Sequence, residues 1–440
     1  MKEVHAKYLN ENKQETVSSS TFVCKPVPIE YCMCGYCMNV RNKLLTLEHS
    51  KKTSPKAVNE YDILEMILCP KSSSQRFFSI DRIEGRCKKC SNYLETLEDI
   101  YKEIPNDKEL TWNKWERVDG KMLLVSCTGT KKELINELVH TNLKNPAQGT
   151  TFTKHIHTAQ WQQEQFSLIK ENLPHKWVIQ VMDFAKNRGV SYQEEVKAAF
   201  FSNSQITIHP IVNYYRKRDK PGIVKDSCII LSEDVNQDFH AVNFYKSLVD
   251  KHIESQLGAA LEKMVVYSDG CSSQYKSKGP FADLSLADIP ISRNFLGSEH
   301  GKSACDAEIG VLNRAIDRAI IGTKVIINNT EDLFKFCEEN LVLDELFTKR
   351  RNFMFVKGKE IPRERPETIV KPIANSKKIH NMENTSVPYM IKTRNLSCFW
   401  IECMKGKSDN CLNSEYISGY KLQKITVVQN GAKNRSKETK

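Results

Sequence analysis

The sequence predicts an α/β protein in which helices flank a mixed β-sheet, with a small helical, cysteine-rich domain before the sheet and a basic tail after it. Three observations lead to this prediction. Apolar runs of strand length alternate with amphipathic stretches of helix length between about 173 and 350. Seven of the 15 cysteines precede residue 91. Most of the excess positive charge lies in the segment 351–440.

The length of the chain allows several segments of different character. At 440 residues, two or three folded domains are expected. We predict a disordered lead, a zinc-binding domain, a helical connector, an α/β core and a basic tail, at 1–20, 21–100, 101–172, 173–350 and 351–440 respectively. The hydrophobic content is 40%, and no apolar run reaches the roughly 20 residues that a membrane span needs. We therefore expect a soluble, intracellular protein without a membrane partner.

The basic tail points to a polyanionic partner. From Arg351 to Lys440 the chain carries 18 Lys and Arg against 8 Asp and Glu, a net +10 of the total +11. Such a segment suits nucleic acid, because each phosphate contact releases condensed counterions and adds salt-sensitive affinity. DNA is the partner we expect, and a solvated tail without a partner is the alternative.

The cysteines are clustered, which in a reduced intracellular chain favours metal binding over disulfides. Two pairs, Cys34 with Cys37 and Cys87 with Cys90, have the two-residue gap that lets both thiolates of a pair reach one ion. We predict that these four bind a structural zinc ion. The alternates are Cys32 and Cys69. A looser candidate group in the tail consists of Cys398, Cys403 and Cys411, with His380 nearby. Free buried cysteines are the alternative to both sites.

Between about 173 and 321 the elements can be followed in order. Strands are expected at 177–182, 195–201, 205–215, 228–231, 264–267 and 295–296, and long helices at 242–257 and 303–321. The runs Trp177–Met182 and Met264–Tyr267 are almost wholly apolar, which is typical of strands buried on both faces, and they lead to Asp183 and Asp269. The order of elements is typical of a ribonuclease H-like core. It consists of three strands, a helix, a strand ending in aspartate, and a late helix with a carboxylate in its first turn.

These acids suggest a site for Mg²⁺ or Mn²⁺. Reaction at a phosphodiester requires charge to be neutralised on the attacking and leaving oxygens, which two ions roughly 3.5 to 4 Å apart achieve. Such ions prefer oxygen ligands, and strand ends can hold Asp183 and Asp269 at one sheet edge. Asp306 is the preferred third ligand and Glu308 the reserve, because Glu308 lies nearer the helix stripe that should pack on the sheet.

Candidate phosphate-binding or supporting residues beside the acids are His300, Lys302, Gln274 and Lys276. For each of these residues, an ordinary structural role is the alternative.

Four stretches of the chain resemble successive motifs of a transposase-derived family found in animal genomes. They are VMDFAKN at 181–187, SQITIHPIVNYY at 204–215, YSDGCSSQYK at 267–276 and SEHGKSACD at 298–306. The likeness runs from about Cys32 to Cys411 and is most specific over 177–315. Members are similar to cut-and-paste DDE/D transposases, so the resemblance implies a ribonuclease H-like domain, divalent-metal catalysis, DNA as substrate and Asp183, Asp269 and Asp306 as the three acids.

The chain departs from the family pattern after the third acid. Residues 307–314 read AEIGVLNR where a Gly-rich stretch leading to a Lys-Arg pair is expected. Two functions are therefore carried forward. The first is a transposase-like nuclease of the nucleus that cleaves DNA and transfers strands. The alternative is a catalytically inactive DNA-binding or chromatin-associated zinc protein derived from a transposase. The oligomeric state is left open.

Overall fold

A computed structural model describes most of the chain from Cys34 onward. The described residues are 34–53, 61–71, 76–90, 92–144, 151–190, 204–217, 222–298, 300–301, 303–322, 325–343, 349–407, 411 and 413–428. The chain divides into two units, Met1–Met33 and Cys34–Lys440, and only the second contains described residues. Four predicted features lie outside the described residues: the disordered lead, the strand at 195–201, Cys32 and Lys302.

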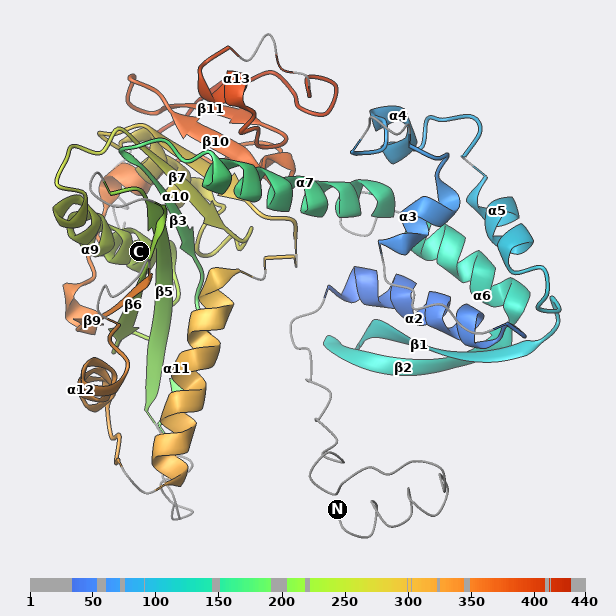
Figure 1. Ribbon diagram of the computed structural model, residues 1–440, viewed down its shortest axis with the longest axis horizontal. Coiled ribbons are helices and arrows are strands. Elements are labelled where there is room, and N and C mark those ends of the chain that lie inside the picture. Colours follow the sequence, from blue (N-terminus) through green and yellow to red (C-terminus); the bar gives the residue numbers. More distant parts are fainter. Residues whose placement is uncertain are drawn as a thin grey trace, which may run out of the picture. The chain divides into compact units, whose positions relative to one another are not determined.

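A mixed sheet forms the core of the second unit from β3 onward (Figure 1). Its strands are β3 (Trp177–Met182), β4 (Arg188–Gly189), β5 (Gln205–Tyr215), β6 (Val224–Ser232), β7 (Lys263–Ser268), β8 (Ile291–Phe295), β9 (Lys349–Val356), β10 (Asn381–Asn384), β11 (Met390–Arg394) and β12 (Lys421–Lys424). Across the sheet the order is β12-β11-β10-β8-β7-β3-β5-β6-β9, and β4 pairs with β5. β3, β7 and β8 are parallel, whereas β5 is antiparallel to β3 and β6. The predicted α/β class, with a mixed sheet flanked by helices, is confirmed.

Helices cover both faces of this sheet because the central strands are apolar on both sides. In β3, Val178 and Met182 pack with α9 (Phe239–Leu257) and α10 (Lys278–Ser285). Ile179 and Val181 point to the other face. That face is covered by α7 (Phe152–Glu171) and α11 (Ala304–Ile321), and α12 (Thr330–Asn340) packs beside α11. No helix in the described part of the chain is long and apolar enough to cross a membrane.

The residues before the sheet form one core rather than a zinc domain and a separate connector. The elements are α2 (Gly35–His49), α3 (Asp62–Ile67), α4 (Ile80–Ile83), α5 (Tyr93–Ile100), the hairpin strands β1 (Glu109–Val118) and β2 (Lys121–Thr130), α6 (Lys131–Glu137) and a π-helix, η1 (Leu138–Lys144). A single apolar cluster extends from Cys34 to Trp161, includes Trp112 of β1, and also contains Leu396 and Tyr416 from later in the chain. The cluster therefore crosses the predicted boundary at 100, and the segment predicted as a helical connector contains an antiparallel hairpin.

The basic segment 351–440 is not a tail. β9 pairs in parallel with β6 at one end of the sheet, and β10 pairs with β8 on the other side. Between and after these strands lie the 3-10 helices η3 (Gly358–Glu360), η4 (Pro366–Thr368) and η5 (Ser376–Lys378), and the short helix α13 (Ile401–Met404). Apolar residues of this segment, such as Met382 and Ile391, are fully buried in the core beneath α9 and α10. The predicted core boundary at 350 cuts through β9 and needs to be moved beyond β12.

Candidate metal centres

Two of the predicted acids follow neighbouring parallel strands at the same edge of the sheet. The register of β3 and β7 pairs Val181 with Tyr267. Asp183 and Asp269 each come two residues later, so continuing the register places them side by side. Neighbouring strands lie about 4.8 Å apart, which is a suitable distance for two carboxylates to share cations. The main chain of Asp183 is also tied to β5, because its N–H donates to the Pro210 carbonyl at 3.4 Å.

The third predicted acid, Asp306, lies in the first turn of α11. Its carboxylate accepts a hydrogen bond of 2.7 Å from the N–H of Ser303, as part of a capping box. The preceding residue, Cys305, is buried. Its thiol donates to the Val181 carbonyl at 3.3 Å, and its Sγ lies 3.5 Å from the Pro210 carbonyl oxygen. These contacts fix the first turn of α11 over the end of β3 and the middle of β5, so Asp306 approaches the edge where Asp183 lies.

The acids interact electrostatically. Burial raises the pKa of Asp183 to about 7, and the nearby carboxylates of Asp269 and Asp306 add to this rise. Burial also raises the pKa of Asp269, opposed by the N–H of Cys271 and by Lys276. The carboxylates of Asp183, Asp269 and Asp306 are not among the clusters of described residues in which all ligand atoms lie within 4.8 Å of one another.

Glu308, the predicted reserve, is occupied in a structural role. Its carboxylate is buried, lies 2.5 Å from the Lys225 amine and 2.9 Å from Nε of Arg351, and accepts a hydrogen bond from the Ser227 hydroxyl. Burial alone would raise the pKa of Glu308, but these cations lower it overall. Two residues along a helix rotate a side chain by about 200°, which is why Asp306 is exposed while Glu308 faces the sheet.

The other predicted supporting residues lie near the acids but have different partners. Lys276 interacts with Asp269, and its amine donates to the Lys377 carbonyl at 3.2 Å. Burial lowers the pKa of Lys276 to about 8, and Asp269 opposes that shift. Gln274 donates to Gln237 at 3.4 Å, and Gln237 in turn holds the main chain just after Asp183 through the Ala185 carbonyl. Gln274 therefore contacts the residues that hold the segment after Asp183, and its described hydrogen bond is not to an acid.

The four cysteines predicted to bind one zinc ion do not come together. The structure divides them between two groups of side chains with ligand atoms within 4.8 Å of one another. The first group, called here the Cys₂His₂ group, consists of Cys34, Cys37, His155 and His300. The second consists of Cys69, Cys87 and Cys90. Each Cys-x-x-Cys pair keeps to its own local element, with Cys34 and Cys37 at the start of α2 and Cys87 and Cys90 between α4 and α5.

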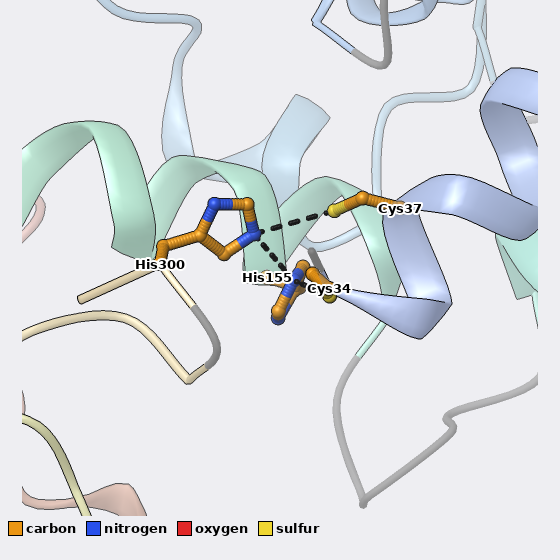
Figure 2. A group of neighbouring side chains, drawn as sticks. All are labelled: Cys34, Cys37, His155 and His300. Carbon is orange, nitrogen blue, oxygen red and sulfur yellow. Dashed lines mark hydrogen bonds between the residues drawn. The ribbon is translucent and has the colours of Figure 1, made fainter. Parts of the chain in front are cut away.

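Figure 2 shows how the Cys₂His₂ group converges from separate parts of the chain. Nε2 of His155 lies 3.4 Å from Sγ of Cys34, and Nε2 of His300 lies 3.3 Å from Sγ of Cys37. The two Nε2 atoms are 3.0 Å apart. His300, predicted to support the acids, thus points its ring to the thiols instead. His155 was not predicted as a ligand at all, and the only local signal for it is the His-x-His pattern near the start of α7.

One face of α7 holds the loop that carries His300. Ala159 and Gln163 follow His155 at spacings of four and eight residues, so the three share a helix face. The loop passes so close that a Cβ on Gly297 would lie 2.8 Å from Cα of Ala159, and the Gln163 amide donates to the His300 carbonyl at 3.2 Å. Glycine at 297 therefore permits the close approach that brings His300 to His155.

The environment of the thiols favours the thiolate form. Cys34 occupies the N-cap position of α2, where the helix dipole stabilises negative charge. Hydrogen bonds lower the pKa of the Cys34 thiol, first from Cys37 and then from His155 and His300, against the opposing effect of burial. Thiolates and neutral imidazoles are the ligands that zinc prefers.

A family model of a domain of unknown function, DUF8701, matches residues 162–398, more than half of the chain. The chain belongs to this family. A search of curated proteins finds no match. The DUF8701 span contains the three acids and His300, whereas Cys34, Cys37 and His155 precede it. The Cys₂His₂ group therefore joins the family domain to the residues before it.

One loop of the DUF8701 span, between β8 and α11, contains a member of the Cys₂His₂ group and contacts one of the acids. His300 belongs to the group, and the next residue, Gly301, packs against the second acid, because a Cβ there would lie 3.4 Å from Cβ of Asp269. Asp306 follows in the first turn of α11. His300 is thus adjacent to the residue that contacts Asp269, and it precedes Asp306 by six residues.

A third group of cysteines lies near the end of the DUF8701 span. Sγ of Cys398 is 3.5 Å from Sγ of Cys403 and 3.6 Å from Sγ of Cys411. His380, predicted nearby, is not in this group, since its Nδ1 donates to the Asn395 carbonyl at 3.0 Å. Among the described residues, this group and the group of Cys69 each supply three ligands of the four in a closed zinc site.

Proposed function

We propose that the chain is a transposase-like nuclease with a ribonuclease H-like core, which cleaves DNA phosphodiesters and transfers strands in the nucleus. The observation that carries the proposal is the meeting of Asp183, Asp269 and Asp306 at one sheet edge, supplied by two parallel strands and a helix N-terminus. The order of strands supports it, since β6-β5-β3-β7-β8 places three antiparallel strands beside two parallel ones, as expected for that core.

The acids fit divalent cations by their chemistry. Burial and mutual repulsion raise the pKa of Asp183, and a bound cation would relieve both effects. Asp183, Asp269 and Asp306 would hold two Mg²⁺ or Mn²⁺ ions, which neutralise charge on the attacking and leaving oxygens of a phosphodiester. Lys276 lies beside Asp269 and supplies a further positive charge at the edge where a phosphate would approach.

Nicking of supercoiled plasmid in the presence of Mn²⁺ tests this function. We expect the full chain to nick DNA and Asp269→Ala to lose that activity, because the substitution removes one of the three proposed cation ligands. Asp317→Asn is the matched control, since Asp317 is an acid of α11 that pairs with Arg188 away from the edge. Equal nicking by the wild type and Asp269→Ala would sink the proposal.

The inactive DNA-binding protein is the second candidate, and one contact favours it. The Asp306 carboxylate already caps α11 through the Ser303 N–H at 2.7 Å, and this bond competes with cation binding. A chain of this kind would bind DNA with an affinity that falls steeply with salt and would show no cleavage with Mn²⁺. The same plasmid assay, run beside a salt titration of DNA binding, separates the two functions.

A further inference from the structure

We propose that Cys34, Cys37, His155 and His300 bind one zinc ion that joins the helical core before the sheet to the loop between β8 and α11. This inference concerns four residues outside the acid site and does not rest on the proposed nuclease activity. It replaces the set of four cysteines expected from the sequence with two cysteines and two histidines from three separate segments.

The distances fit tetrahedral zinc. With Zn–S near 2.3 Å and Zn–N near 2.0 to 2.1 Å, tetrahedral geometry separates sulfur from nitrogen by about 3.6 Å and nitrogen from nitrogen by about 3.3 Å. The observed sulfur–nitrogen distances are 3.4 and 3.3 Å, and the nitrogen–nitrogen distance is 3.0 Å. All four ligand atoms lie within 4.8 Å of one another. Each of these three distances is within about 0.3 Å of its tetrahedral value.

Hydrogen bonds alone do not account for these contacts. Each histidine Nε2 offers either one N–H or one lone pair, yet each contacts two partners. Nε2 of His155 approaches both Cys34 and His300, and Nε2 of His300 approaches both Cys37 and His155. A cation at the centre uses one lone pair from each of the four atoms and relieves the competition.

The surroundings resemble those of a structural zinc site. Cys34 and Cys37 are buried, and His155 is 8% exposed, so solvent has little access. The second ring nitrogen of His300, Nδ1, lies 3.5 Å from the Tyr61 hydroxyl. In the tautomer whose Nδ1–H donates to this hydroxyl oxygen, the lone pair of Nε2 is available to a metal. Two sulfur and two nitrogen ligands select zinc over magnesium or calcium, and four protein ligands leave no position open for catalysis.

The site explains how the loop before α11 is held. Without the metal, the loop depends on the Gln163 hydrogen bond and on the contact of Gly297 with Ala159. Zinc would connect His300 to Cys34 and Cys37 at the start of α2 and to His155 of α7. His300 would thus help to hold its neighbour, Gly301, against Asp269.

The test is the zinc content of the purified full-length chain, measured by mass spectrometry without DNA. Because two other cysteine groups are present, the readout is the difference from the wild type. We expect Cys37→Ser and His300→Ala each to lose one zinc per chain, and His300→Cys to keep the wild-type number. Cobalt-loaded His300→Cys should also show a stronger sulfur-to-cobalt absorption than the cobalt-loaded wild type, because it has one more thiolate.

Two control variants show whether a loss of zinc reflects ligation or packing. His157→Ala removes a buried histidine on the same helix, and Cys127→Ser removes a cysteine that belongs to none of the described metal-ligand groups. Both should keep the wild-type zinc content. Wild-type zinc in His300→Ala and Cys37→Ser overturns the proposal, and so does an equal loss in His157→Ala. A chain with this zinc but no nicking activity would contradict only the proposed function.

Discussion

Replacing Asp183 with asparagine should stabilise the metal-free protein while removing a ligand. Asparagine keeps the shape of the side chain and the oxygen that accepts the Phe184 N–H at 2.9 Å. It removes a charge that burial and the neighbouring acids disfavour, since they raise the pKa of Asp183 from 3.8 to about 7. The raised pKa means that the folded chain holds this proton more tightly than the unfolded chain. Ionisation therefore destabilises the fold.

The magnitude follows from linkage. A rise of about 3 pKa units corresponds to about 4 kcal/mol of unfolding free energy, lost by the wild type as the pH rises from about 4 to about 7. Asp183→Asn does not titrate and escapes this loss. The variant should exceed the wild type by about 4 kcal/mol at pH 8 and by about 2 kcal/mol at pH 5.5, with the difference vanishing well below pH 4.

Urea unfolding of both chains at pH 8 and pH 5.5, without added Mg²⁺ or Mn²⁺, measures these differences. Comparison at each pH cancels the titration of groups common to both chains. Adding Mn²⁺ at pH 8 should then raise the stability of the wild type and not that of the variant, because binding to the folded state alone stabilises it. The reasoning is refuted if Asp183→Asn is equal to or less stable than the wild type at pH 8.

Two further predictions concern parts of the fold that the sequence did not reveal. Glu308→Gln should lower the unfolding free energy by about 2 kcal/mol at pH 7, because Lys225 and Arg351 lose their shared partner. Since the pKa of Glu308 is lowered, this cost should disappear as the pH falls below about 4, and a cost that does not change with pH in urea unfolding would contradict it. A chain ending at 348 lacks β9 to β12 and exposes the edges of β6 and β8. It should aggregate or elute as an expanded species in size-exclusion chromatography, and a compact monomer with the wild-type melting temperature would show that 349–428 is dispensable.

The central strands could be predicted because short apolar runs in the sequence indicate strands that are buried on both faces. β3 and β7 are covered on both faces, so nearly every residue from Trp177 to Met182 and from Met264 to Tyr267 is apolar. β6 was recognised only at its apolar centre, 228–231, and the structure extends it to Val224–Ser232. The approach of Asp183 to Asp269 also followed from the sequence, because strands that run parallel end at the same edge.

The outer strands could not be predicted because they lack that signal. β10 consists of Asn381–Asn384, with two asparagines and a glutamate among its four residues. Its polar side chains are satisfied by partners far away in the sequence, as when the Asn381 amide donates to the Asn294 side chain at 2.9 Å. Such pairing depends on tertiary contacts, and the high proportion of Lys and Arg across 351–440 led to the prediction of a basic tail.

The residues that join Cys34 and Cys37 could not be predicted from the sequence, for a related reason. A Cys-x-x-Cys pair shows that two thiols can reach one ion, but it does not show which other residues complete the site. Cys34 and Cys37 are completed by His155, more than a hundred residues along, and by His300 beyond β8. The packing of Gly297 against Ala159 decides this arrangement, and no local pattern reveals it.

The Cys₂His₂ group and the acids depend on the same loop, and this has a consequence for how the protein could be divided. The loop between β8 and α11 carries His300 at one end and leads to Asp306 at the other, while Gly301 lies against Asp269. The span matched by the family model begins after His155, so an isolated family domain would contain His300 without its three partner ligands. An unpartnered loop of this kind has fewer contacts and opens more easily. The acids of such a fragment would then lose the fixed spacing that shared cations require, even though all three are present.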